Sequence, residues 1–218
     1  MNEKESPAAL ISALTTEHFV LQTAANATVS DAAARSSLYV FALSSSLVAI
    51  GFASRSRDIF MPFAAIVLPG LFVFGLMTIV RLVDSALENM RYLEGIARIR
   101  AYYRTMSPEA ETCFAARHGR WPETGAEPSM RLGPLVALFT TSAGAIALIN
   151  NIVAGVGVAL LAGELVGRSQ TRLALLAGVV AALILTAAFL TYERWRFRVF
   201  DHSADRVEPT PTIPRPSK

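Results

Sequence analysis

The chain has 218 residues, of which 53% are hydrophobic and 17% charged, and its formal net charge is +3. Ordinary soluble proteins carry about 25% charged residues. A composition this apolar and this weakly charged excludes a disordered chain and a strongly nucleic-acid-binding protein.

The apolar residues are gathered in four runs that contain no charged residue: 36–54, 59–80, 132–163 and 173–192. A helix needs roughly 20 residues to cross the hydrocarbon core of a bilayer, so each run is long enough. A soluble bundle would place charges at helical spacing along these runs, and none is present. We therefore predict an all-α fold, a four-helix transmembrane bundle of two helical hairpins, whose third span covers 135–161.

Residues 1–35 precede the first span, at 36–54, and their apolar residues recur at helical spacing. This pattern predicts an amphipathic segment on the cytoplasmic side. Thr28 to Asp31 has the spacing of a capping box, Thr-x-x-Asp, which is typical of a helix start. We therefore expect a new helix near residue 29 and a break around Asn26 to Val29.

The second span, 59–80, is followed by a helical insert at 81–131. Its apolar stripe keeps the helical period while charges of opposite sign alternate on the other face, so we expect the second helix to continue through residue 106. Ser107-Pro108-Glu109 is typical of a further helix start. Because the insert is too small for a rich core of its own, we expect it to pack on itself or on a cytoplasmic protein partner.

The third span carries a ridge of small or short side chains at every fourth position. Such ridges let membrane helices approach closely, so we predict a helix-packing face here, either within the chain or between subunits. A shorter match occurs in the fourth span, at 173–192. The ridge of the third span consists of Ala143, Ala147, Asn151, Gly155, Ala159 and Gly163.

Asn150 and Asn151 form the only adjacent amide pair inside any span. A polar side chain at this depth needs a partner. Two interpretations follow: the pair makes hydrogen bonds between helices, or it lines a pore. No Asp, Glu, Lys, Arg or His lies inside any span, which disfavours an ion-coupled transporter.

The fourth span is followed by residues 193–218, which begin with alternating cations and aromatic rings. Aromatic rings lie at the headgroup level and arginines bind anionic lipid, so we predict a membrane anchor there, followed by a disordered, proline-rich tail. The anchor residues are Arg194, Trp195, Arg196, Phe197 and Arg198.

The cations are distributed unevenly along the chain. Sixteen of the 20 lysines and arginines lie in residues 1–35, 81–131 and 193–218, and four lie beside the two hairpin turns. Segments rich in Lys and Arg stay in the cytoplasm. We therefore expect a multi-pass protein of the bacterial inner membrane with both termini and the insert in the cytoplasm.

Residues Leu14 to Ala24, leading into Ser36 to Gly51, resemble the opening of an uncharacterised group of bacterial four-span integral membrane proteins. The resemblance covers roughly residues 10–55. It implies a bacterial membrane protein and assigns no activity and no site residue.

The sequence predicts no catalytic, cofactor or metal site, because its three histidines and single cysteine share no ligand or nucleophile spacing. We therefore expect no enzyme, no cofactor and no nucleic-acid partner. The predicted function is a structural or regulatory membrane module that self-associates through its small-residue faces and contacts a cytoplasmic protein through 81–131. The alternative is an oligomeric, pore-forming effector that surrounds Asn150 and Asn151.

Overall fold

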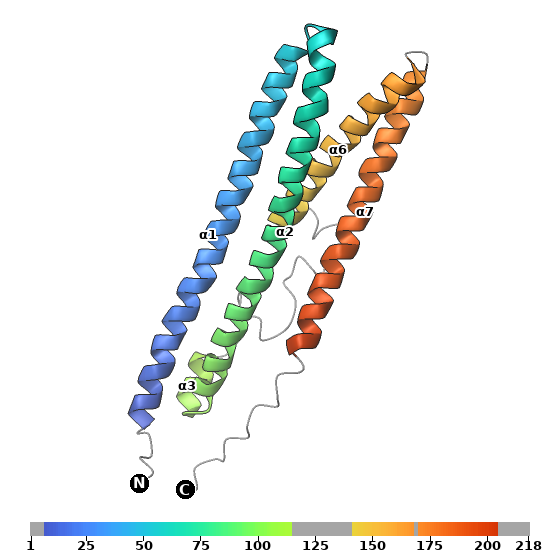
Figure 1. Cartoon of the computed structure of the whole chain (residues 1–218). Helices are drawn as coiled ribbons and strands as arrows, with labels where there is room; N and C mark the ends of the chain where they lie inside the picture. Colours follow the sequence, from blue (N-terminus) through green and yellow to red (C-terminus); the bar gives the residue numbers. More distant parts are fainter. Residues whose placement is uncertain (1–6, 115–140, 168–169, 205–218) are drawn as a thin grey trace.

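The computed structural model describes residues 7–114, 141–167 and 170–204, and all regular structure in these residues is helical. Two long hairpins lie side by side (Figure 1). The all-α fold predicted from the sequence is confirmed. The proline-rich part of the predicted tail lies outside the described residues.

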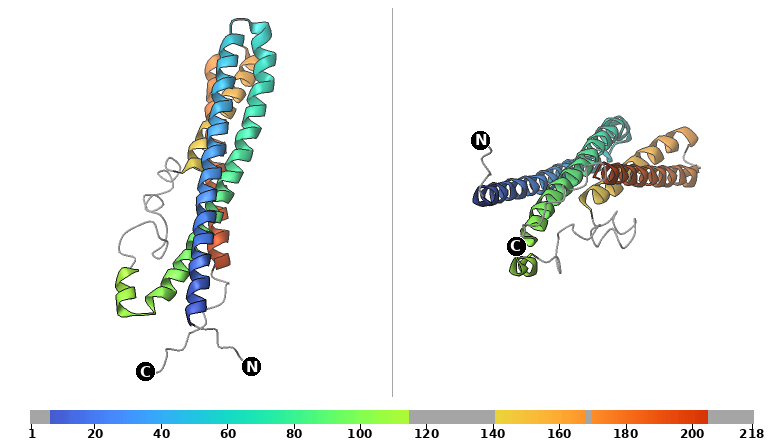
Figure 2. Two further views of the ribbon diagram at one scale, coloured as in Figure 1. Left: turned by 90° about the vertical axis from the view of Figure 1, so that its left-hand side faces the viewer. Right: turned by 90° about the horizontal axis from the view of Figure 1, so that it is seen from below.

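The first hairpin consists of α1, Pro7–Ala53, and α2, Arg57–Arg104, joined by a tight turn. The two helices pack along most of their length (Figure 2). Residues 81–104 continue α2 without a break, as the periodicity predicts. Pro62 and Pro69 lie inside this helix, which stays helical through both.

The predicted break around Asn26 to Val29 is wrong, because α1 is continuous there. The Thr28 hydroxyl donates to the Ala25 carbonyl at 2.7 Å and accepts from Asn89 Nδ2 on α2 at 2.9 Å. Thr28 is therefore an interior helix residue in a contact between helices and not an N-cap. The capping-box pattern depends only on neighbouring residues, whereas the partner that determines the role of Thr28 is Asn89 on another helix.

The short helix α3, Pro108–Cys113, begins where Ser107-Pro108-Glu109 predicts. The Ser107 hydroxyl accepts from the Ala110 N–H at 3.0 Å and so caps the helix. α3 packs against the end of α2. Phe114, the residue after α3, contacts Tyr103 of α2, and the centroids of the two rings are 5.5 Å apart.

The second hairpin consists of α6, Ser142–Val166, and α7, Thr171–Ala204. Thr141 caps α6 by accepting from the Gly144 N–H at 3.0 Å, so this helix begins at Ser142. Residues 135–140 of the predicted third span lie outside the described residues. α6 ends at Val166, and its C-cap, Gly167, has a φ of 81°, which suits glycine. The fourth helix continues well past residue 192, so the predicted anchor is helical.

The described parts of the four uncharged runs lie side by side in the same half of the molecule, and both hairpin turns lie at its end (Figure 1). All four helices are long and apolar enough to cross a membrane. We call residues 36–54, 59–80, 142–163 and 173–192 the membrane bundle, and the end with the turns the loop end. Residues 7–35 of α1 and 81–104 of α2 form a second region, which we call the stalk.

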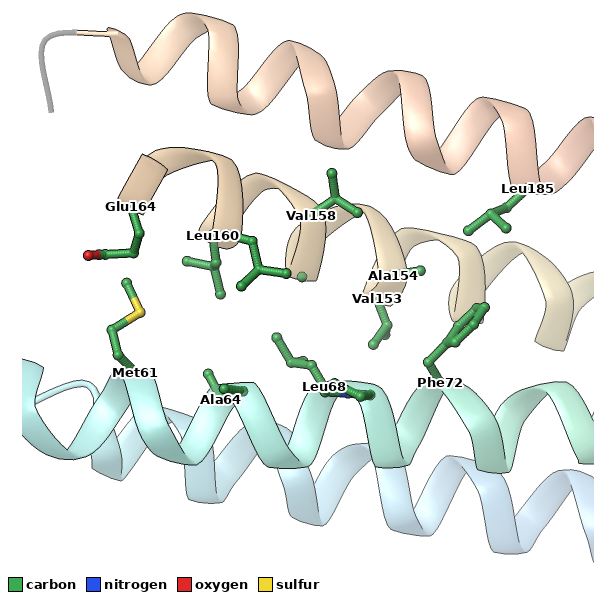
Figure 3. A pocket seen from close by; sticks show the side chains of 14 residues that line it. Met61, Ala64, Leu68, Phe72, Val153, Ala154, Val158, Leu160, Glu164 and Leu185 are labelled. Carbon is green, nitrogen blue, oxygen red and sulfur yellow. The ribbon is translucent and has the colours of Figure 1, made fainter. Parts of the chain in front are cut away.

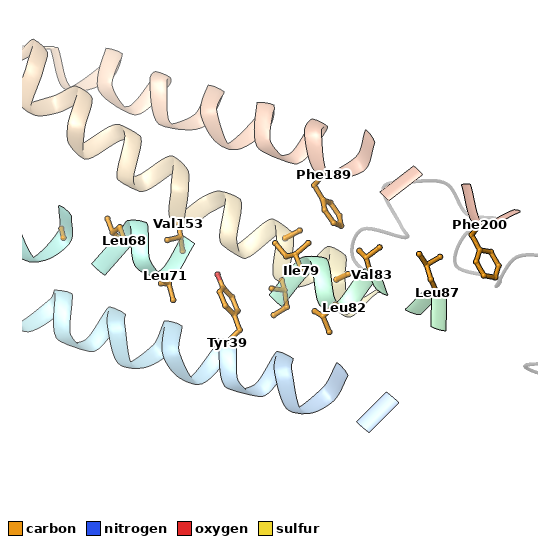
Figure 4. Close-up of a cluster of buried hydrophobic side chains, with 14 residues drawn as sticks. Tyr39, Leu68, Leu71, Ile79, Leu82, Val83, Leu87, Val153, Phe189 and Phe200 are labelled. Atoms are coloured by element: carbon orange, nitrogen blue, oxygen red, sulfur yellow. The ribbon is translucent and has the colours of Figure 1, made fainter. Parts of the chain in front are cut away.

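The buried core follows α2, the central helix, from the membrane bundle into the stalk (Figure 4). Leu68 and Leu71 of this core lie in the bundle, whereas Leu87 lies in the stalk. Large apolar side chains also cover the outside of the bundle; Phe41, for example, is 73% exposed. An apolar exterior at this depth is suited to lipid.

Candidate functional site

A polar junction joins the two hairpins in the part of the membrane bundle nearer the stalk. Tyr39 on α1 donates its hydroxyl to Asn150 Oδ1 on α6 at 3.1 Å, and Asn150 Nδ2 donates to the Phe72 carbonyl of α2 at 3.2 Å. Both polar side chains are fully buried. Three helices are thus linked by two hydrogen bonds. Because water is absent inside a bilayer, these bonds also supply the partners that the buried side chains of Tyr39 and Asn150 need.

Gly75 of α2 makes room for this junction. A Cβ at Gly75 would lie 2.1 Å from Asn150 Oδ1 and 2.7 Å from Tyr39 Cε2. Both distances are far below van der Waals contact, so only glycine fits between the two side chains.

Asn151 faces the other side of α6 and is also buried. Its Nδ2 donates to Thr186 Oγ1 on α7 at 3.2 Å, and the Thr186 hydroxyl donates to the Ala182 carbonyl at 2.8 Å. Asn150 and Asn151 therefore both bind partners within the same chain. This arrangement favours hydrogen bonding between helices over the lining of a pore.

The small-residue ridge of the third span contacts the fourth span. A Cβ at Gly155 would lie 2.6 Å from the Gly178 carbonyl oxygen, and a Cβ at Gly178 would lie 2.4 Å from that of Gly155. Near the loop end, a Cβ at Gly163 would be in ordinary contact with Ala174. The ridge, with Ala143, Ala147, Asn151 and Ala159, is therefore an intramolecular packing face, and a second copy would have to bind elsewhere.

A network of charged side chains ties α1 to α2 where the stalk meets the bundle. Asp31 accepts from Arg35 Nε at 3.0 Å and lies 3.4 Å from Arg81 Nε, and Arg81 Nη1 donates to Glu88 at 3.2 Å. The hydrogen bond from Arg35 and the nearby charge of Arg81 lower the pKa of Asp31 below its usual range. The carboxylate is therefore held ionised between two guanidinium groups.

The predicted anchor residues divide between two roles in α7. Arg196 Nη2 donates to Asp84 Oδ1 of α2, and Phe197 packs against the core. Trp195 is 57% exposed, and Arg194 and Arg198 are also exposed. One face of the anchor thus holds α7 to the stalk, and the exposed face remains suited to the headgroup level.

At the loop end the hairpins are joined by an ion pair, in which Arg57 Nη2 donates to Glu164 Oε1 at 2.6 Å. Beside it, α2 and α6 enclose a groove of about 360 Å³ (Figure 3). Its lining is apolar except for Glu164.

No group of three or more His, Cys, Asp or Glu side chains suited to a metal ion occurs in residues 7–114, 141–167 and 170–204. Comparisons with protein-family models, curated proteins and solved structures find no match for this chain.

Sequence reasoning found Asn150 and Asn151 but not their partners. Tyr39 and Gly75 could have been identified from the sequence as contact residues, since a tyrosine hydroxyl inside a span needs an acceptor and a glycine inside a span allows close approach. The ion pair between Asp84 and Arg196 could not, because the two residues are 112 positions apart.

Proposed function

We propose that this protein is a non-enzymatic membrane scaffold that presents a helical stalk to a protein partner in the cytoplasm. The proposal places the protein in the bacterial inner membrane with both termini on the stalk side. It keeps residues 81–131 as the partner-binding part, of which 81–114 are described here.

The observation that carries the proposal is the continuation of two membrane helices far beyond their apolar segments. At 1.5 Å per residue, residues 7–35 of α1 extend about 43 Å and residues 81–104 of α2 about 36 Å. The headgroup region adds only about 6 Å on each side of the hydrocarbon core. A stalk that stands along the membrane normal therefore reaches well into water, where a soluble protein can bind it.

The stalk is a pair of helices that pack against each other. Ile96 and Ile99 of α2 are buried, and a Cβ at Gly95 would lie 2.9 Å from Leu21 of α1. Asn89 Nδ2 also donates to the Ala25 carbonyl at 3.0 Å. A stalk packed in this way holds its exposed face in a constant arrangement, as a docking surface requires.

The distribution of cations supports the orientation. Arginines are concentrated beside the stalk end of the bundle, and short basic segments stay in the cytoplasm. The exposed face of the stalk would then be available to cytoplasmic proteins.

A photo-crosslinking experiment tests the proposal with two matched positions on α1. Phe19 in the stalk is 66% exposed and Phe41 in the membrane bundle is 73% exposed. Replacing each in turn by a photoreactive phenylalanine changes little in shape. In the native host, we expect a discrete protein adduct from position 19 and lipid adducts from position 41.

An adduct with the mass of two chains from position 19 would identify a second copy as the partner of the stalk. Exposed Arg98 on α2 provides a second stalk position. The absence of any protein adduct from both stalk positions in irradiated native membranes would refute the proposal.

A further inference from the structure

The apolar groove between α2 and α6 has a closed floor and an open side. Ala64, Leu68 and Val153 on its floor are buried, whereas Pro69 and Leu161 on its rim are exposed. The groove therefore opens sideways from the membrane bundle, toward the surrounding lipid.

The groove has the length of one leaflet. It extends along α2 from Met61 to Phe72, which is about 16 Å at 1.5 Å per residue. Half of a hydrocarbon core about 30 Å thick is about 15 Å. Figure 3 shows Glu164 and Met61 at one end and Phe72 and Leu185 at the other, so the groove begins at the loop end and stops near the polar junction.

Charged groups lie at the loop end of the groove. The side chains of Arg57 and Glu164, which form an ion pair, are 53% and 44% exposed. A guanidinium group has five N–H donors, so Arg57 can bind an anionic oxygen while it binds Glu164. Arginine is well suited to phosphate.

We propose that this groove binds one phospholipid from the leaflet at the loop end. One acyl chain lies between α2 and α6, and the headgroup phosphate binds Arg57. The volume of about 360 Å³ lies near the lower limit of small-ligand sites, about 300 to 1,000 Å³, which suits a chain molecule better than a helix of a second copy. The proposal is independent of the stalk and its partner.

Two glycines allow a matched test. Gly157 lines the groove, and a Cβ there would lie 3.9 Å from Leu68 Cδ1, which is ordinary contact. Gly157→Leu therefore fills the groove without a backbone clash. Gly70 on α2 does not line the groove, and a Cβ there meets nothing within 4 Å, so Gly70→Leu is the control.

The full chain is reconstituted in nanodiscs of phosphatidylethanolamine and phosphatidylglycerol, released into mild detergent, and measured by native mass spectrometry. We expect one phospholipid retained on the wild type and on Gly70→Leu, and loss of that peak for Gly157→Leu. Ala65→Phe, which fills the groove from the opposite helix, should show the same loss even if Gly157→Leu folds poorly.

Equal retention by the wild type and both groove variants would overturn the proposal, as would a wild type that retains no lipid. Equal loss from Gly70→Leu would show that the retained lipid lies elsewhere. A two-chain species abolished by Gly157→Leu would assign the groove to a second copy.

Discussion

The membrane bundle and the stalk share the helices α1 and α2, and the bundle also contains parts of α6 and α7, but the two regions differ in the contacts that hold them together. In the bundle, the contacts depend on Gly75 and on the buried hydrogen bond from Tyr39 to Asn150. In the stalk, the contacts depend on buried apolar side chains such as Ile96 and on charged networks such as that of Asp31.

The difference follows from the two solvents. In water, burying apolar side chains stabilises a helix pair because it removes them from water. In lipid this driving force is absent between helices, so close packing and hydrogen bonds between helices must supply the stability. Because the uncharged run of α1 begins at residue 36 and that of α2 ends at residue 80, we expect the membrane boundary to lie near the charged network of Asp31 and Arg81.

The largest expected effect comes from placing a charge at matched positions on the two sides of this boundary. Phe41→Arg should oppose membrane insertion by up to about 2.5 to 3.5 kcal/mol, the cost of a charge at the centre of a span, because its charge would lie inside the hydrocarbon core. Phe19→Arg, at a similarly exposed stalk position, should insert like the wild type. The measurement is the inserted fraction of each variant, and equal insertion would mean that the boundary lies elsewhere.

Gly155→Leu tests close packing in the bundle. Because its Cβ would lie 2.6 Å from the Gly178 carbonyl oxygen, the helices must move apart, and we expect a loss of about 1 to 3 kcal/mol in the free energy of unfolding. Titration with a denaturing detergent in mixed micelles measures the free energy of unfolding of the variant and of the wild type. Gly70→Leu is the control, and an equal effect at the two positions would argue against packing at the ridge.

Tyr39→Phe tests the polar junction. The substitution removes one hydrogen bond between α1 and α6, and such bonds contribute on average about 0.6 kcal/mol in membrane proteins, with a maximum near 1.7. A double-mutant cycle with Asn150→Leu, measured in the same unfolding assay, isolates the interaction. A coupling energy of zero would show that the two side chains act independently.

Asp31→Asn tests the charged network and has the smallest expected effect, because these side chains are exposed to solvent. The pKa of Asp31 is lowered in the folded protein, so its stabilising contribution is present above about pH 3.9, the ordinary pKa of aspartate, and is lost as the pH falls below it. The melting temperature of the wild type should therefore exceed that of Asp31→Asn at neutral pH by a small margin that disappears in acid. A margin that grows on acidification would contradict this assignment.

The sequence was sufficient to predict the four apolar spans, the continuation of α2 and the cap at Ser107, because each depends on neighbouring residues. It misjudged Thr28 for the same reason: a local pattern indicated a cap, whereas Asn89, 61 residues away, holds the segment within a longer helix. The ridge on the third span and the shorter small-residue match on the fourth were both identified, but the sequence did not predict that the two faces contact each other.

What the sequence alone determined is where this chain is apolar enough to enter lipid, since that property can be counted residue by residue. Only the tertiary structure decided what each polar or small side chain binds: Asn150 binds Tyr39, Gly155 contacts Gly178 and Arg196 binds Asp84. These pairs come from different helices, and many arrangements of four apolar helices are compatible with one hydropathy pattern. The choice among them depends on how the side chains fit together in space.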